Sequence, residues 1–225
     1  MQQKIKPYMK CLIFIAGLIV IVALSDFLFA KTGYINYIIR QADSKENNEN
    51  VFILGASHGS YGFDSSKMSE ELGMSTMNMC IGGEYMYDAY YILKYALKYK
   101  KLKTVILDLD YQYFVNQHDE SILFNNVYNA YPACNEKLGY YMHKMAREEY
   151  RGTFLRWTNY WQCYKTVGKT IKLKQSDAYK NYSPEVVSMN KYDTYMGNGF
   201  VSRSKDYKKS TTSCLDWDES KLDSE

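Results

Sequence analysis

The sequence predicts an α/β fold built on a parallel β-sheet and preceded by an apolar helix of transmembrane length. Two observations carry this prediction. Between residues 51 and 109, three short apolar runs alternate with segments of helical periodicity, which is the order that builds a parallel sheet. Near the N-terminus, an uncharged run over residues 11–24 and the apolar residues 27–30 together reach about 20 residues, enough to cross a bilayer as a helix.

Size and composition fit one globular domain with additions. Of the 225 residues, 46% are hydrophobic and 24% are charged, which excludes wholesale disorder. Beyond residue 30 the chain holds 25 basic and 24 acidic residues, so it lacks the basic surface that nucleic-acid binding requires. None of the five cysteines form a Cys-x-x-Cys pair. We therefore expect no nucleic-acid partner, no metal and no cofactor.

The N-terminus is predicted to be a signal anchor. Residues 1–10 carry three lysines ahead of the apolar run of residues 11–30: Lys4, Lys6 and Lys10. The positive-inside rule then places the N-terminus in the cytoplasm and the body outside the cell membrane. A cleaved signal peptide is the alternative, but its apolar region is usually about 7–15 residues long and no clear cleavage site follows here. A buried soluble helix is a third option.

The first ordered elements are expected after a linker. Residues 31–50 end in a polar stretch without periodicity, so we predict that they are a linker. A buried strand is predicted over Val51–Leu54, because this apolar run is stopped by Gly55. A turn of small residues follows. Asp64 is then expected to cap a short helix over residues 67–72.

Two further strands and a long helix complete the predicted core. Residues 75–80 alternate in character and predict a second strand, which ends at a glycine turn. Residues 85–99 predict a helix, since tyrosines recur every four positions beside an apolar face. Residues 104–109 predict a third strand, apolar enough to be central in a parallel sheet.

The part after residue 114 is expected to be helical and rich in loops, within one domain over residues 51–225. Helices are predicted over residues 119–128, 135–150 and 154–173, whereas residues 175–225 show no strand pattern. Three strands are few for a parallel sheet. We therefore expect a truncated chain whose sheet is incomplete, with a complete small protein as the alternative.

Ser57 is the candidate nucleophile. It follows a predicted buried strand and stands among small residues, which allow a substrate carbonyl to approach. Backbone N–H groups at the start of a following helix can then face an oxyanion. The alternative is a turn serine that forms only local hydrogen bonds.

Residues 51–113 resemble the SGNH/GDSL hydrolase superfamily, in particular its membrane-anchored, DltD-like members. Residues 51–58 (VFILGASH) resemble the first block, and residues 78–83 (NMCIGG) resemble the second. Residues 104–110 stand where a strand leads to the third block. The resemblance implies a three-layer, flavodoxin-like parallel sheet, with Ser57 as nucleophile and the N–H groups of Ser57 and Gly83 in the oxyanion hole.

Four more residues are expected to line this site: His58, Asn78, Asp108 and Asp110. Asp108 and Asp110 end a strand, where they would either bind a cation or cap the loop. The third block lacks its usual asparagine, and no Asp-x-x-His sequence, the family's source of the catalytic base, occurs anywhere in the chain. A serine without a base is a poor nucleophile. The three histidines are His58, His118 and His143.

Two functions follow as expectations. The first is a membrane-anchored, extracytoplasmic serine esterase or acyltransferase acting on acyl or acetyl esters of cell-envelope glycopolymers. Without its base motif this chain would be weakly active or inactive, so its status as an enzyme stays open. The alternative is a non-catalytic, membrane-anchored binding or assembly protein with a degenerate domain of the same type.

Overall fold

A computed structural model of the chain describes residues 6–30, 33–44, 48–114, 121–144, 152, 155–176, 187–189 and 191–204. The chain divides into two compact units. The first comprises Met1–Thr32 and Glu149–Ser176, and the second comprises Gly33–Glu148 and Asp177–Glu225. The region after residue 50, expected to form one domain, is thus divided, and residues 149–176 belong with the apolar helix.

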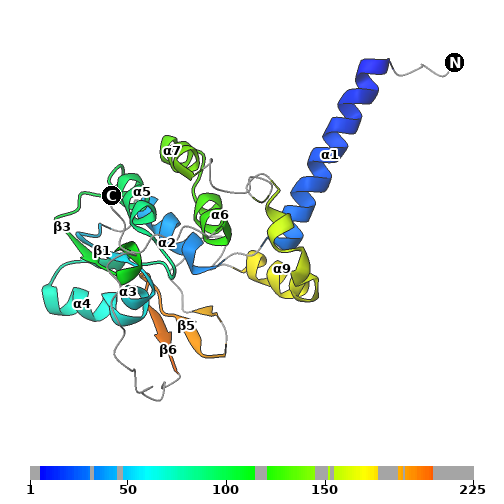
Figure 1. Cartoon of the computed structure of the whole chain (residues 1–225). Helices are drawn as coiled ribbons and strands as arrows, with labels where there is room; N and C mark the ends of the chain where they lie inside the picture. Colours follow the sequence, from blue (N-terminus) through cyan, green and yellow to red (C-terminus); the bar gives the residue numbers. More distant parts are fainter. Residues whose placement is uncertain are drawn as a thin grey trace. The chain divides into compact units, whose positions relative to one another are not determined.

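A parallel sheet forms the centre of the second unit, as predicted. Its three strands are β1 (Val51–Gly55), β2 (Thr76–Asn78) and β3 (Thr104–Asp108). The strand order is β2-β1-β3, and β1 runs parallel to both neighbours. Figure 1 labels β1 and β3. All five residues of β1 are buried. The α/β class with a parallel sheet is therefore confirmed.

The third strand differs from its prediction. β3 was expected in a central position, but it pairs with β1 alone among the described strands and lies at the edge of the sheet. Val105 and Leu107 are 40% and 42% exposed. A short apolar run can form either a central strand or an edge strand. The sequence therefore did not show which of these two positions β3 takes.

Helices α4 and α5 form close to their predicted bounds. α4 (Ser65–Leu72) begins after Asp64, whose carboxylate accepts hydrogen bonds from two backbone N–H groups of the first turn. α5 (Met86–Ala96) begins after Tyr85, whose N–H donates to the Asp88 carboxylate in a capping box. At the start of each helix, a side-chain carboxylate therefore accepts hydrogen bonds from backbone N–H groups that have no partner within the helix.

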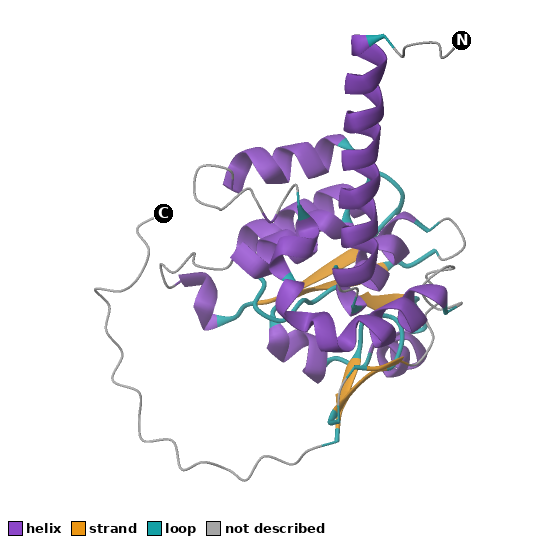
Figure 2. Cartoon of the chain, turned by 90° about the vertical axis from the view of Figure 1, so that its right-hand side faces the viewer, coloured by secondary structure: helices purple, strands orange, loops and turns teal. Residues whose placement is uncertain are grey.

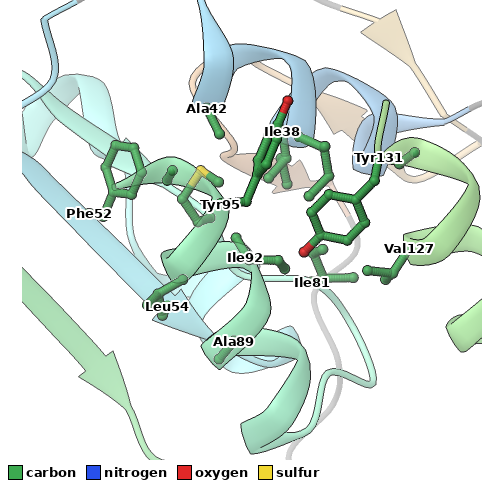
Figure 3. Close-up of a cluster of buried hydrophobic side chains, with 14 of the residues drawn as sticks. Ile38, Ala42, Phe52, Leu54, Ile81, Ala89, Ile92, Tyr95, Val127 and Tyr131 are labelled. Atoms are coloured by element: carbon green, nitrogen blue, oxygen red, sulfur yellow. The ribbon is translucent and has the colours of Figure 1, made fainter. Parts of the chain in front are cut away.

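The expected linker contains a helix, α2 (Tyr34–Asp43), which corrects the prediction for residues 31–50. Four of its apolar residues are buried: Tyr37, Ile38, Ile39 and Ala42. Ile38, Ile39 and Ala42 meet β1, α5 and α6 (Ser121–Ala130) in the main hydrophobic core, where Ile38 and Ala42 lie near Tyr95 (Figure 3). Tyr37 belongs to a second, smaller cluster with Tyr195 and Val201. The polar stretch after residue 43 concealed this short amphipathic segment.

Two more helices follow their predicted positions. α6 covers most of the predicted residues 119–128, and α7 (Asn135–Lys144) covers the first part of residues 135–150. Residues 145–150 lie outside the described part of the chain. Phe124 of α6 stacks on Tyr140 of α7 with ring centroids 5.0 Å apart.

A second, antiparallel sheet was not predicted. It contains β4 (Val187–Ser188), β5 (Asp193–Tyr195) and β6 (Val201–Arg203), and it is a separate group of strands from the parallel sheet (Figure 2). Strands of two or three residues are too short to show alternation. The turn between β5 and β6 has positive φ values at Gly197, Asn198 and Gly199, which is the hairpin signal that the sequence did carry.

The first unit contains the apolar helix. α1 (Pro7–Phe29) is long and apolar enough to cross a membrane, and residues 6–21 are all exposed. Three shorter elements accompany it: η2 (Arg156–Asn159), η3 (Trp161–Thr166) and α9 (Val167–Gln175).

The single helix predicted over residues 154–173 is therefore wrong. Its first half forms two 3₁₀ segments, η2 and η3, and only α9 is α-helical. The Trp157 N–H donates to the Asp26 carboxylate of α1, and the Tyr160 N–H bonds to the Trp157 carbonyl three residues back. These bonds replace the regular α-helical pattern of four-residue steps.

Candidate functional site

The candidate site lies at the carboxyl edge of the parallel sheet, where the loops after β1, β2 and β3 begin. Ser57 is the first residue of α3 (Ser57–Gly62), directly after β1. A Cβ placed on Gly82, in the loop after β2, would lie 3.8 Å from the Ser57 Cβ. Gly83, the predicted oxyanion donor, is the next residue and has a φ of +81°. The serine and the glycine loop therefore meet, as strands that run parallel require.

Asn78 holds these two loops together. Its side-chain amide donates to the Gly59 carbonyl at 2.8 Å and to the Phe63 carbonyl at 3.0 Å, both in or beside α3. Its side-chain oxygen accepts the Cys80 N–H at 3.0 Å. Asn78 is fully buried, so losing any of these bonds would leave an unsatisfied group away from water.

Gly55 and Gly59 have no side chain and therefore let β3 approach α3, the helix that begins with Ser57. A Cβ at Gly55 would lie 2.7 Å from the Asp108 Cβ, and one at Gly59 would lie 3.0 Å from the Asp108 Oδ2. A Cβ at Gly59 would also collide with the sulfur of Cys80. Burial raises the pKa of the Cys80 thiol well above its usual range, so this cysteine is a packing residue.

His58 is directed at Asp110. The His58 Nδ1 lies 2.9 Å from the Asp110 Oδ2, and the aspartate side chain is fully buried while the histidine side chain is 69% exposed. Within the described part of the chain, no hydrogen bond joins the Ser57 hydroxyl to a histidine. His143 is exposed beside the Tyr87 ring, and His118 lies outside the described residues.

Tyr34 is a site residue that the sequence analysis missed. Its hydroxyl oxygen accepts the Gly82 N–H at 2.8 Å, beside the point where Gly82 approaches Ser57. Burial raises the pKa of Tyr34 to about 12, so the phenol keeps its proton at neutral pH and can donate it in a hydrogen bond. Tyr34 begins α2, in the segment predicted to be a linker, which is why no motif pointed to it.

Three buried polar atoms in the loops at this edge have no hydrogen-bond partner: Glu84 Oε1, Asp108 Oδ2 and Tyr113 Oη. The other Glu84 oxygen accepts the Ile81 N–H at 3.0 Å. Burial, reinforced by Asp88, raises the pKa of Glu84 well above its usual range. Burial and then Glu84 are the main causes that raise the pKa of Tyr113. Among the described residues, this edge therefore holds buried polar groups whose hydrogen-bonding capacity is not satisfied.

The described residues contain no group of three or more His, Cys, Asp or Glu side chains placed to hold a metal ion. Asp108 ends β3 and Asp110 lies two residues beyond it, but Asp110 pairs with His58 instead of forming a shared carboxylate site. The arrangement offers a serine hydroxyl, a phenol donor and a backbone turn, which is the chemistry of acyl transfer.

The comparisons with known proteins give no information on function. No family model, no curated protein and no solved structure matches this chain. The predicted resemblance to SGNH hydrolases therefore stays a prediction.

We predict that Asn78→Asp destabilises the second unit by about 2–4 kcal/mol, because a carboxylate cannot donate to the two carbonyl groups that it would face. Asn48→Asp makes the same chemical change at an exposed position and should alter stability by less than about 0.5 kcal/mol. Denaturant unfolding of the full chain in detergent micelles, followed by near-ultraviolet circular dichroism, measures both. Equal losses in the two variants would show that Asn78 does not hold the serine loop.

Proposed function

We propose that the chain is a membrane-anchored, extracytoplasmic serine esterase or acyltransferase domain of the SGNH type, with acyl or acetyl esters of cell-envelope glycopolymers as substrates. One observation carries the proposal. Ser57 directly follows the central parallel strand and faces a glycine turn whose Gly82 N–H is bonded to a protonated phenol. A three-layer arrangement of the sheet and its helices is part of the same proposal.

The reaction begins with attack of the Ser57 oxygen on the acyl carbonyl carbon. The new Oγ–C bond turns the carbonyl oxygen into an oxyanion, which accepts hydrogen bonds from the N–H groups of Ser57 and Gly83 and from the Tyr34 hydroxyl. The C–O bond to the alcohol then breaks, and the serine proton leaves with the alcohol. Water or an acceptor hydroxyl later takes the acyl group and returns the proton to Ser57.

Proton transfer is the slow part of this scheme. The described residues place no base against the Ser57 hydroxyl, since His58 is bound to Asp110. The serine must therefore lose its proton without a positioned acceptor, which removes the usual contribution of about 10²–10⁴ to the rate. The same observation favours the alternative function, a non-catalytic binding or assembly protein anchored in the membrane.

The anchor is supported by α1. The helix spans 23 residues and carries no buried residue, and its apolar part follows Lys4, Lys6 and Lys10. Its length of about 35 Å exceeds the hydrocarbon core of a bilayer. The positive-inside rule supports an N-terminus in the cytoplasm and a second unit outside the cell membrane.

Covalent labelling tests the role of Ser57. We expect a fluorophosphonate probe to modify Ser57 slowly, while hydrolysis of an aryl acetate stays close to the uncatalysed rate and changes little in Ser57→Ala. Intact-mass and peptide mass spectrometry should locate the adduct on Ser57 and find none on that peptide in Ser57→Ala. Ser66→Ala, which removes a serine in the first turn of α4, should leave the labelling unchanged.

Two results would contradict this account. Labelling of Ser57 no faster than that of Ser66 would remove the enzyme proposal and leave the binding or assembly function. Rapid turnover that depends on Ser57 would show that a base does reach the serine, and loss of that turnover in His58→Ala would identify it.

The Tyr34 hydroxyl is expected to speed labelling of Ser57 as an oxyanion donor. Tyr34→Phe should slow the reaction by at least about tenfold. It also removes the acceptor of the Gly82 N–H, which should cost about 1–3 kcal/mol of stability, so labelling rates are compared under conditions in which both chains are folded. Because the pKa of Tyr34 is about 12, this difference should persist from about pH 7 to pH 10. Tyr90→Phe, at a half-exposed tyrosine of α5, is the matched control. Equal labelling rates in native and Tyr34→Phe chains would exclude the phenol from the reaction.

A further inference from the structure

Residues 155–176, here called the collar, are bound to the C-terminal end of α1. The Lys174 amine donates to the carbonyl oxygen of Phe27 at 2.6 Å and to that of Asp26 at 3.3 Å. The Trp157 N–H donates to the Asp26 carboxylate at 2.9 Å. A lysine at the end of a helix can bind carbonyl groups of the last turn, and the Asp26 carbonyl accepts the Ala30 N–H as well. These contacts join α9 and η2 to α1.

The length of α1 fixes the depth of these contacts in a bilayer. A hydrocarbon core of about 30 Å requires about 20 helical residues. The apolar segment starts at Cys11, directly after Lys10, and its twentieth residue is Ala30. Asp26 and Phe27 therefore lie near the boundary between hydrocarbon and headgroups, and the collar residues that contact them lie at headgroup depth.

The exposure of α1 agrees with this placement. Residues 6–21 are all exposed, as the part of a helix that contacts lipid must be in the absence of a partner. Burial begins only at the end of the helix, where Ala30 is 1% exposed. The collar thus covers the last turns of α1 and leaves the rest to the bilayer.

The collar has the composition of a membrane interface. Three aromatic residues of the collar fall within eight positions: Trp157, Tyr160 and Tyr164. Tryptophan and tyrosine concentrate at the headgroup level of membranes, because one end of each side chain is polar and the rest is apolar. Tyr164 is 60% exposed, which is unusual for so large a ring unless something covers it.

A basic face lies beside these aromatic residues. Three lysines are exposed: Lys165 near the end of η3, and Lys169 and Lys172, which lie three residues apart on α9. On the other side of α9, Thr170 and Lys174 are buried. No carboxylate forms an ion pair with the three exposed lysines in the part of the chain that the structure describes. The face is therefore free to bind anions.

We infer that the collar docks on the anionic phospholipid headgroups that surround the end of α1. The lysines of the basic face bind lipid phosphates, and the aromatic residues enter the interface beside them. This inference rests on the anchor part of the proposed function, because it requires α1 to cross a bilayer. It is independent of the chemistry at Ser57 and of the direction in which α1 crosses.

Lysine footprinting of the native chain tests the inference. The full chain is reconstituted into phosphatidylcholine vesicles, either pure or with about 30 mol% phosphatidylglycerol, and treated with a water-soluble acylating reagent. We expect the anionic lipid to slow modification of Lys165, Lys169 and Lys172 by at least about threefold, and about 0.5 M salt to restore it. Mass spectrometry gives the rate at each lysine, with the exposed Lys94, Lys101 and Lys103 of the second unit as internal controls.

Three outcomes would decide whether the collar binds anionic phospholipid. Equal modification of the three collar lysines in both kinds of vesicle would overturn the inference, as would slowing that affects the control lysines to the same degree. Protection of the collar lysines alone would support it. Flotation with pure phosphatidylcholine vesicles reports separately on α1, because a chain that fails to float there lacks the anchor, whatever the lysines show.

Discussion

The buried side chain of Asn78 is the constraint on which the second unit depends. It connects β2 to the helix that carries Ser57, through two carbonyl groups, and it fixes the start of the glycine loop through the Cys80 N–H. The Asn78 backbone N–H also donates to the Asn198 carbonyl, so the β5–β6 hairpin is tied to the same residue. A residue with no exposure to water has no substitute partners, and the loops around Ser57 therefore keep one arrangement.

In the function proposed here, this arrangement supplies part of an acyl-transfer site. The nucleophile, the glycine turn and the Tyr34 phenol come together, while the nearest histidine is held away from the serine by Asp110. A site with stabilising donors and no positioned base would bind and orient an ester better than it would cleave it. The two proposed functions, esterase and binding protein, thus share one geometry. They differ in whether the serine proton is removed.

The sequence was most informative where a pattern repeated. The buried run at β1, the Asp64 cap and the α5 periodicity predicted their elements closely, because burial and capping leave regular signatures. It failed at α2, which is followed by a polar stretch without periodicity, and at β4–β6, whose strands of two or three residues are too short to establish a period. It also failed at η2 and η3, where the Trp157 N–H bonds to the Asp26 carboxylate. Ser57 and Asn78 followed from motifs. Tyr34 and the His58–Asp110 pair required the fold, since residues far apart in sequence form both contacts.

A crystal structure of the chain after reaction with a fluorophosphonate tests the central claim most directly, that Ser57 and Tyr34 form one site. We expect the phosphonyl group on the Ser57 oxygen, with its P=O oxygen at about 3 Å from the Tyr34 hydroxyl, where an oxyanion would sit. A P=O oxygen directed at His58 or at solvent, with Tyr34 beyond hydrogen-bond distance, would contradict the account.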